Sequence, residues 1–314
     1  MKTLDELKSV YELPLPELIL QAAEVHRTNH SFRDVQRCAL LSIKTGGCPE
    51  DCAYCAQSAR YTTPVQPMPL LSVSEVEELA TQARRLGATR FCLGAAWREP
   101  PDGPVFERVL DMVRAIRRLG MEACVTLGML TDEQAQRLRD AGLTAYNHNL
   151  DTSRRHYGQI ISTRTYEDRL QTLRAVARAG IAVCCGGIVG MGETEEDRLS
   201  FLAELSALAP PPESIPINCL VPISGTPLEN SPPVDSFQLV RLVATTRIAF
   251  PRSRVRLSAG RDRMSRELQA LCFLAGANSI FFGEKLLTAP NPSASADAEL
   301  FRALGLPLAV PVES

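Results

Sequence analysis

Residues 43–61 read IKTGGCPEDCAYCAQSARY and carry the most specific pattern in the chain. They continue a short apolar run at 39–43 that predicts a strand. Gly46 and Gly47 allow the backbone to turn sharply, so the side chains that follow can converge on one centre. The side chains that matter here are those of Cys48, Cys52 and Cys55. Three thiolates are one short of the four that complete a [4Fe–4S] cluster or a structural zinc site, so one iron is left open to a cofactor or substrate.

The C-x3-C-x2-C spacing resembles the signature of the radical S-adenosylmethionine (SAM) enzymes. In those enzymes the open iron is chelated by the amino and carboxylate groups of the methionine part of SAM. An aromatic residue just before the last cysteine, here Tyr54, lies near the adenine. Two other interpretations of the same residues remain open at this point. They are a zinc knuckle with a distant fourth ligand and a redox-active C-x2-C pair.

Composition describes an ordinary globular chain of 314 residues, 45% hydrophobic and 22% charged, with ten cysteines. The formal net charge of −2 gives no electrostatic reason to expect nucleic acid or an anionic membrane as a partner. The charged segment 1–14 lacks the apolar core of a secretory signal, and no run approaches the roughly 18 apolar residues of a membrane span. These features predict a cytoplasmic protein with reduced, metal-binding thiols. We expect Arg114, Arg117 and Arg118 to lie on a solvated helix face.

Short apolar runs alternate with amphipathic segments along most of the chain. The eight predicted strands are 39–43, 90–93, 122–126, 145–149, 182–185, 215–220, 254–257 and 279–282. Helix signals lie between them; for example, Ser72 and Glu75 form a capping box for a helix that runs to Gly87. Strands that alternate with helices predict a parallel sheet, and eight of them predict an α/β fold of the (β/α)8 TIM type. A doubly wound open sheet with an added domain is the rival, and both place the site at the carboxyl ends of the strands.

The predicted domain organisation has three parts. Two short helices, at 3–10 and 15–29, make an N-terminal helical cap over residues 1–35. The barrel occupies 36–290, and a C-terminal helix and tail occupy 291–314.

Three further cysteines, Cys92, Cys124 and Cys184, fall on three different predicted strands. Alternate residues of a barrel strand point inward, so these thiols can meet in the lumen, and a second metal centre there is a hypothesis. A lone buried cysteine usually acts as a small hydrophobe, and that interpretation stays open for each of them. It is the interpretation that we adopt for Cys38, placed before the first strand, and for Cys219 and Cys272.

Two details of this second centre remain undecided from the residues alone. The adjacent Cys184 and Cys185 point to opposite sides of a strand, so register determines which thiol faces inward. Arg256 lies on the seventh predicted strand. Arginine is essentially never deprotonated, which makes it an improbable metal ligand on general grounds and favours a role in a salt bridge.

Seven blocks of sequence together resemble the biotin synthases. They are SIKTGGCPEDCAYCAQS (42–58), LGAAWREP (93–100), YNHNLDTS (146–153), GGIVGMGE (186–193), PINCL (216–220), RLSAGR (256–261) and GANSIFFGEKLLTAPNP (276–292). The resemblance covers nearly the whole chain. It implies a homodimeric radical SAM (β/α)8 barrel that inserts sulfur between two unactivated carbons of dethiobiotin. It also implies an electron donor such as flavodoxin or ferredoxin.

The resemblance also assigns residues to cofactors and substrate. It implies a [4Fe–4S] cluster on Cys48, Cys52 and Cys55, and a sulfur-donating [2Fe–2S] cluster on Cys92, Cys124, Cys184 and Arg256. The implied SAM contacts are Tyr54, Ala95, Asn149, Asp151, Arg169 and Ile188. The implied dethiobiotin contacts are Asn149, Asn218 and Thr288, with Ala289 where the family often has a second threonine. His148 is given a structural role and no part in proton transfer.

Two alternatives to sulfur insertion are kept. Another radical SAM barrel, such as a hydrogenase-maturation or amino-acid-radical enzyme, would keep the three-cysteine loop without needing the second cysteine set. A non-catalytic iron–sulfur or zinc scaffold would not cleave SAM.

Overall fold

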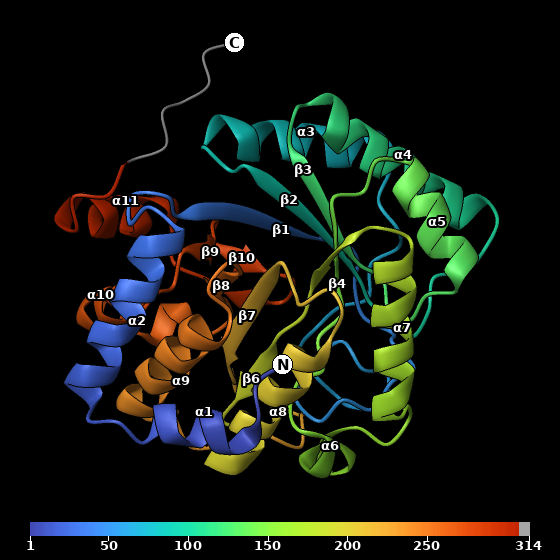
Figure 1. Ribbon diagram of the computed structural model, residues 1–314. Coiled ribbons are helices and arrows are strands. Elements are labelled where there is room, and N and C mark those ends of the chain that lie inside the picture. Colours follow the sequence, from blue (N-terminus) through green and yellow to red (C-terminus); the bar gives the residue numbers. More distant parts are fainter. Residues whose placement is uncertain (308–314) are drawn as a thin grey trace.

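A ring of parallel strands forms the centre of the protein in the computed structural model, which describes residues 1–307 (Figure 1). The strands are β1 (Gln36–Lys44), β2 (Arg90–Ala95), β3 (Glu122–Thr126), β4 (Ala145–Asn147), β5 (Ala182–Cys184), β6 (Gly187–Val189), β7 (Ser214–Cys219), β8 (Arg254–Leu257) and β9 (Ser279–Phe281). Their order around the sheet is β5-β4-β3-β2-β1-β9-β8-β7-β6. β5 also pairs with β7, at Cys184 opposite Ser214, and this pairing closes the ring.

β5 and β6 occupy one position in the ring, because only residues 185 and 186 separate them and both pair with β7. The ring therefore has the eight strand positions of a (β/α)8 barrel. The predicted barrel is confirmed, and the open doubly wound sheet is wrong, because an open sheet would leave β5 without its β7 partner. Gly186 lies at the interruption, where an added Cβ would stand 1.9 Å from the Pro216 carbonyl oxygen.

Helices surround the ring (Figure 1). They are α3 (Val73–Arg85), α4 (Pro104–Arg118), α5 (Asp132–Asp140), α6 (Arg154–Ile160), α7 (Tyr166–Arg178), α8 (Glu195–Ala207), α9 (Ser236–Ala249), α10 (Arg266–Leu274) and α11 (Ala294–Ala303), with a 3-10 turn at Arg261–Arg263. The predicted capping box is present, since Ser72 and Glu75 bond each other's backbone N–H at the start of α3. On α4 the predicted solvated face is confirmed, because Arg114, Arg117 and Arg118 are exposed.

Two N-terminal helices, α1 (Leu4–Tyr11) and α2 (Leu15–Asn29), pack on the outside of the helical layer beside α8, α9 and α10 (Figure 1). Arg241 of α9 binds the segment that connects these two helices. Its Nη1 donates to the carbonyl oxygens of Tyr11 and Leu13, at 2.7 Å each. The division into units at 1–35, 36–290 and 291–314 stays a prediction, and residues 308–314 lie outside the described part of the chain.

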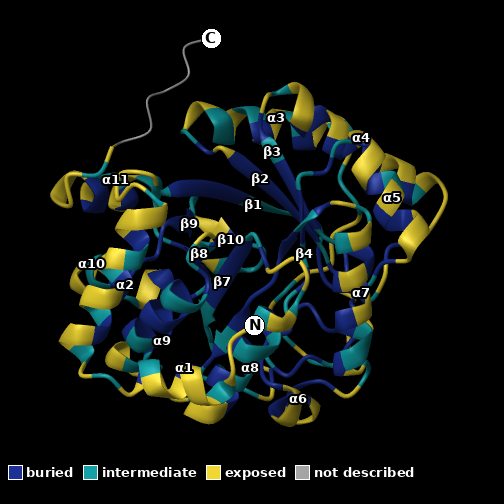
Figure 2. Ribbon diagram, viewed as in Figure 1, coloured by how far each residue is buried: buried dark blue, intermediate teal, exposed yellow. Residues whose placement is uncertain are grey.

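The barrel strands are buried on both faces, one toward the helices and one toward the inside of the ring (Figure 2). On β2, Phe91 and Leu93 join the large apolar core under the helices, whereas Cys92 belongs to a separate small cluster inside the ring. This is the period-two alternation expected of barrel strands. Within residues 1–307, no helix is both long and apolar enough to cross a membrane.

Two features differ from the sequence-based expectation. Cys38 does not precede the first strand, because β1 begins at Gln36 and Cys38 pairs with Arg90 and Phe281. The predicted strand was too short because it was drawn around an apolar run, and the polar residues before that run also belong to it. In addition, residues 285–290 form a small hairpin, β10 (Lys285–Leu286) with β11 (Ala289–Pro290), beyond the last barrel strand.

Candidate active site

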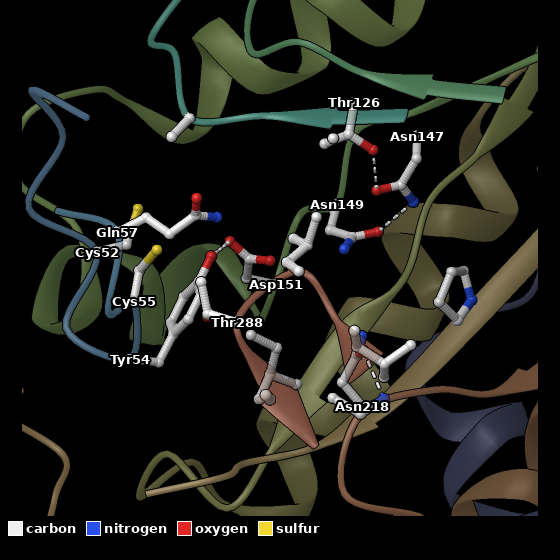
Figure 3. Close-up of a pocket in the computed structure, with 18 of the residues that line it drawn as sticks. Cys52, Tyr54, Cys55, Gln57, Thr126, Asn147, Asn149, Asp151, Asn218 and Thr288 are labelled. Carbon is white, nitrogen blue, oxygen red and sulfur yellow. Dashed lines mark hydrogen bonds between the residues drawn. The ribbon is translucent and has the colours of Figure 1, made fainter. Parts of the chain in front are cut away.

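A cavity of about 320 Å3 opens at the carboxyl ends of the barrel strands and reaches down into the ring. Figure 3 shows part of its wall, with Cys52 and Cys55 at one end and Asn147 and Asn218 at the other. The sequence-predicted residues that line it are Cys48, Cys52, Tyr54, Cys55, Cys92, Ala95, Cys124, Asn149, Asp151, Arg169, Ile188, Asn218, Arg256 and Thr288. Segments far apart in the sequence thus contribute to one chamber.

The three-cysteine loop folds back on itself beside this cavity. Gly46 and Gly47 have φ values of +68° and +65°, a left-handed conformation that favours glycine. The Cys48 N–H then donates to the Gln57 carbonyl at 2.9 Å, and the Cys55 N–H donates to the Cys52 carbonyl at 2.9 Å. All three cysteines of the folded loop line the cavity.

The loop thiols are buried enough to resist ionisation. Burial and the neighbouring Cys52 thiolate raise the pKa of Cys55 to about 12. Burial also raises the pKa of Cys48 and of Cys52. Thiolates that repel one another in a buried place need a cation, and metal binding would release their protons. Arg164, which sequence reasoning missed, already places Nη2 3.6 Å from the Cys52 sulfur.

In the part of the chain that the structure describes, no three His, Cys, Asp or Glu side chains stand close enough to hold one metal ion. A cubane is larger than a single ion and spreads its ligands farther apart. Three cysteines on a short loop, with an open side toward the cavity, have the donor chemistry of such a cluster.

Tyr54, Asp151 and Arg169 form a hydrogen-bonded chain at the cavity wall, in which Asp151 and Arg169 are buried and Tyr54 is partly buried. Figure 3 shows its Tyr54–Asp151 part. The Tyr54 hydroxyl donates to Asp151 Oδ2 at 2.8 Å, and Arg169 Nη2 donates to the same oxygen at 2.5 Å. Asp151 has a φ of +68°, so its backbone turns sharply after β4. Burial, followed by the Asp151 carboxylate, raises the pKa of the Tyr54 hydroxyl. The predicted SAM contacts therefore include one charge-assisted network.

Arg169, one of the expected SAM contacts, uses its guanidinium for contacts within the protein in this structure. Its Nε donates to the Tyr157 hydroxyl at 2.9 Å, its Nη1 donates to the Asn149 carbonyl, and its Nη2 serves Asp151. The guanidinium thus binds a carboxylate of the protein in this structure. Its role toward SAM stays a prediction.

Asparagine side chains make the polar wall on the opposite side (Figure 3). Asn149 Oδ1 accepts from the Gly186 N–H at 2.9 Å and from Asn147 Nδ2 at 3.0 Å. Asn218 Nδ2 donates to the Gly187 carbonyl at 3.0 Å, and its Oδ1 accepts from the Ala259 N–H at 3.2 Å. Backbone contacts therefore hold both carboxamides at the cavity wall.

His148 also lines the cavity, and it is buried. Burial lowers its pKa well below the usual value, and the Arg169 and Arg164 charges act in the same direction. Its imidazole is neutral at ordinary pH, and Nε2 has no hydrogen-bond partner among residues 1–307.

The second cysteine set lies deeper in the ring. Cys92 and Cys124 stand opposite each other on β2 and β3, and both thiols are buried. Cys38 belongs to the same cluster, and its thiol also lies 3.5 Å from Gln36 Oε1 and 3.8 Å from Ser279 Oγ. Treating Cys38 as an ordinary apolar residue was therefore wrong about its surroundings, because it faces thiols and polar atoms.

The strand register places Cys184 and Cys185 on opposite sides of the barrel wall. The Cys184 sulfur accepts from Asn147 Nδ2 at 3.2 Å and from Arg256 Nη1 at 3.6 Å, so it faces the lumen. Cys185 packs in the apolar core outside the ring. The inward thiol is the one that the resemblance assigns to the second cluster.

Arg256 is 1% exposed, and no carboxylate in residues 1–307 pairs with it. It donates instead to Ser279 Oγ at 2.8 Å and to Gln36 Oε1 at 3.1 Å. A buried cation without an anion is costly, so this place favours a bound anionic group. The buried thiols and this guanidinium together have the chemistry of an iron–sulfur site.

The floor of the chamber is an ion-pair network that sequence reasoning missed. Arg90, which is 1% exposed, bonds Glu122 at 2.7 Å and Glu213 at 3.0 Å. A signal for it was present, because Gln36, Arg90 and Glu122 each precede an inward cysteine by two residues. Alternate residues of a strand share a face, so polar residues at that spacing predict a common lumen.

The barrel and its three-cysteine loop are similar to those of a known superfamily. The profile of the Radical SAM superfamily matches residues 42–205, and that of the Biotin and Thiamin Synthesis associated domain matches residues 216–307. Solved structures share the architecture. A methylornithine synthase superposes with a TM-score of 0.81 at 18% identity, covering 98% of this chain and 94% of that one. An [FeFe]-hydrogenase maturase from Carboxydothermus hydrogenoformans superposes with a TM-score of 0.82 at 18% identity, covering 97% of this chain and 75% of that one. The protein is a radical SAM barrel.

Curated relatives narrow the class to one family. The biotin synthase of Methylorubrum populi is 61% identical over 98% of this chain and 90% of its own length. The enzyme of Sorangium cellulosum is 60% identical over 97% of this chain and 87% of its own length, and that of Gloeobacter violaceus is 59% identical over 97% and 96%. The chain belongs to the biotin synthase family.

Proposed function

We propose that the protein converts dethiobiotin to biotin by inserting one sulfur atom at two saturated carbons. The observation that carries this proposal is the presence of two separate thiol sets in one cavity. The loop of Cys48, Cys52 and Cys55 lies at the strand ends. Cys92, Cys124 and Arg256 line the same cavity, and Cys184, which is not part of the lining, contacts Arg256. A radical SAM enzyme that only cleaves SAM needs the first set alone.

Each set has a role in the proposal. Cys48, Cys52 and Cys55 would hold a [4Fe–4S] cluster with its open iron toward SAM, and the lumen set with Arg256 would hold a [2Fe–2S] cluster. When bound, these groups supply an electron to SAM, a 5′-deoxyadenosyl radical that removes hydrogen from carbon, and the sulfur atom that is inserted. Side-chain bases cannot do this work, because hydrogens on saturated carbon are too weakly acidic.

The residues around SAM would position it. Asp151 Oδ1 accepts no hydrogen bond from residues 1–307, so it is available to a ribose hydroxyl while Oδ2 holds Tyr54 and Arg169. Ala95 and Ile188 line the same wall and offer a backbone contact and an apolar surface near the adenine. Arg169 holds Asp151 in place by a buried ion pair.

The residues around dethiobiotin would recognise a cyclic urea and a carboxylate. Asn149 and Asn218 keep N–H donors in addition to the bonds that fix them, and these suit a urea oxygen. Thr288 and Ala289 lie at the wall formed by the hairpin of β10 and β11, where a hydroxyl and backbone N–H groups suit a carboxylate. The enclosed chamber would keep solvent away from a carbon radical.

Three further parts of the proposal come from the family resemblance. We infer a homodimer, a cytoplasmic location and a small reductase such as flavodoxin or ferredoxin as the electron donor. Sedimentation under anaerobic conditions would test the dimer.

The test of function is an anaerobic incubation of the reconstituted protein with dethiobiotin, SAM and a reductant. Biotin and 5′-deoxyadenosine are expected as products, both measured by mass spectrometry. Formation of 5′-deoxyadenosine without biotin would contradict sulfur insertion and favour another radical SAM reaction. Absence of both products would contradict the radical SAM activity itself.

A further inference from the structure

Cys38 is a fourth thiol at the lumen site. It is fully buried on β1 and clusters with Cys92 and Cys124, which are 3% and 1% exposed. None of the seven sequence blocks that define the family resemblance includes it. Its neighbours set it apart from Cys272, which is equally buried but packs in the apolar core under the helices.

Cys38 and Arg256 share two polar partners. The Cys38 thiol lies 3.5 Å from Gln36 Oε1 and 3.8 Å from Ser279 Oγ. Arg256 donates to the same two atoms, at 3.1 Å and 2.8 Å. The thiol and the guanidinium therefore border the same small volume, on the side of the chamber where Arg256 reaches the Cys184 sulfur.

The two groups differ as ligands for iron. A guanidinium stays protonated in proteins and has no lone pair to offer in that form. A thiolate is the usual ligand of a [2Fe–2S] cluster, and four of them complete its coordination. Cys38, Cys92, Cys124 and Cys184 make four thiols from four strands of one ring.

We propose that Cys38 is an alternative fourth ligand of the lumen cluster and can hold the iron that would otherwise be left to Arg256. The inference rests on the proposed function, because it requires a cluster at Cys92, Cys124 and Cys184. It adds that this chain does not depend on Arg256 to keep that cluster. Arg256 then serves as a buried cation beside the thiolates.

The test compares iron and sulfide content and resonance Raman spectra of anaerobically reconstituted variants. Arg256→Ala is expected to keep the lumen cluster, about two irons per chain, with the bands of four thiolate ligands. The double variant Arg256→Ala, Cys38→Ala is expected to lose those two irons and keep the four of the loop. Arg256→Ala, Cys272→Ala is the matched control and should behave like Arg256→Ala. Arg256→Leu, alone and with Cys38→Ala, repeats the comparison with a larger side chain if the alanine variants do not fold.

Two results would overturn the inference. One is loss of the lumen cluster in Arg256→Ala or Arg256→Leu alone. The other is equal iron content in the single variant and the Cys38 double variant. Both are distinct from failure of the proposed function, which would show as absence of the lumen cluster in the unmodified protein.

Discussion

The two cysteine sets of this barrel are built in opposite ways. Cys48, Cys52 and Cys55 come from one short loop, where neighbouring residues shape the site. The lumen thiols come from separate strands. Pairing of β2 with β3 brings Cys92 beside Cys124, and closure of the ring brings Cys184 near Arg256. The first site is a property of local sequence, and the second is a property of topology.

Their electrostatics differ as well. Burial raises the pKa of all three loop thiols, and the neighbouring Cys52 and Cys48 thiolates add to the effect at Cys55. In the lumen, a hydrogen bond from Cys92, together with the charges of Arg90 and Arg256, lowers the pKa of Cys124 despite its burial. The loop has the partly buried Arg164 guanidinium beside Cys52, whereas the lumen contains the fully buried guanidinium groups of Arg90 and Arg256. The buried guanidinium groups of the lumen favour a bound anionic group.

The largest expected effect is on the loop. Cys52→Ala should remove about four irons per chain and reduce 5′-deoxyadenosine formation to the level seen without protein, because no other thiol can reach the vacant position. Biotin should vanish with it, and the lumen irons should remain. Cys272→Ala is the control. Retained SAM cleavage in Cys52→Ala would break the assignment of the loop.

A more selective effect is expected in the lumen. Cys184→Ala should abolish biotin but leave SAM-dependent formation of 5′-deoxyadenosine, since the loop is untouched. Cys185→Ala, one residue away and outside the ring, should keep both activities and cost only about 1 kcal/mol of stability. The reverse pattern would mean that the strand register places Cys185, not Cys184, in the lumen.

A smaller effect is expected at the Tyr54–Asp151–Arg169 network in the cavity wall. Asp151→Asn leaves Arg169 as a buried cation without its carboxylate, which should destabilise the fold by about 3–5 kcal/mol. Weaker SAM binding should accompany it. Anaerobic thermal unfolding and SAM titration measure the two effects, with Asp132→Asn on exposed α5 as control. Unchanged unfolding would contradict the importance of the Tyr54–Asp151–Arg169 network.

The smallest effect is expected in the outer helices, and it concerns stability in acid rather than either cysteine site. Burial lowers the pKa of His26 on α2 to about 3, so the folded protein keeps this imidazole neutral. The unfolded chain binds the proton first, and stability should fall as pH drops below the unfolded value of about 6.5 toward 3, by about 1 kcal/mol near pH 5.5. His26→Leu should lose this acid dependence in unfolding measurements. If the pH dependence of stability were unchanged in that variant, a group other than His26 would be responsible for the loss of stability in acid.

The sequence was informative wherever spacing alone carries the geometry. The loop motif, the capping box at Ser72 and the eight-strand rhythm required only local patterns, and the barrel that they predict is present. The lumen was harder, because contacts among residues on different strands depend on register and closure. Cys38 was misplaced since the strand was drawn around its apolar part, and β1 in fact starts at Gln36.

Period-two spacing can place Arg90 and Glu122 in the lumen, but it cannot show which charged residues of the site pair with one another. The ion pairs of Arg90 with Glu122 and Glu213 join residues on β2, on β3 and just before β7. Likewise, Arg169 faces Asp151 because α7 packs near the end of β4. Neither pair has a spacing along the chain that would reveal it.

The central claim is that one chain holds two iron–sulfur clusters, one on the loop and one in the lumen. Its most direct test is the iron and acid-labile sulfide content of the anaerobically reconstituted protein. About six irons and six sulfides per chain are predicted, the sum of a [4Fe–4S] and a [2Fe–2S] cluster. About four of each, or zinc in place of iron, would contradict the claim.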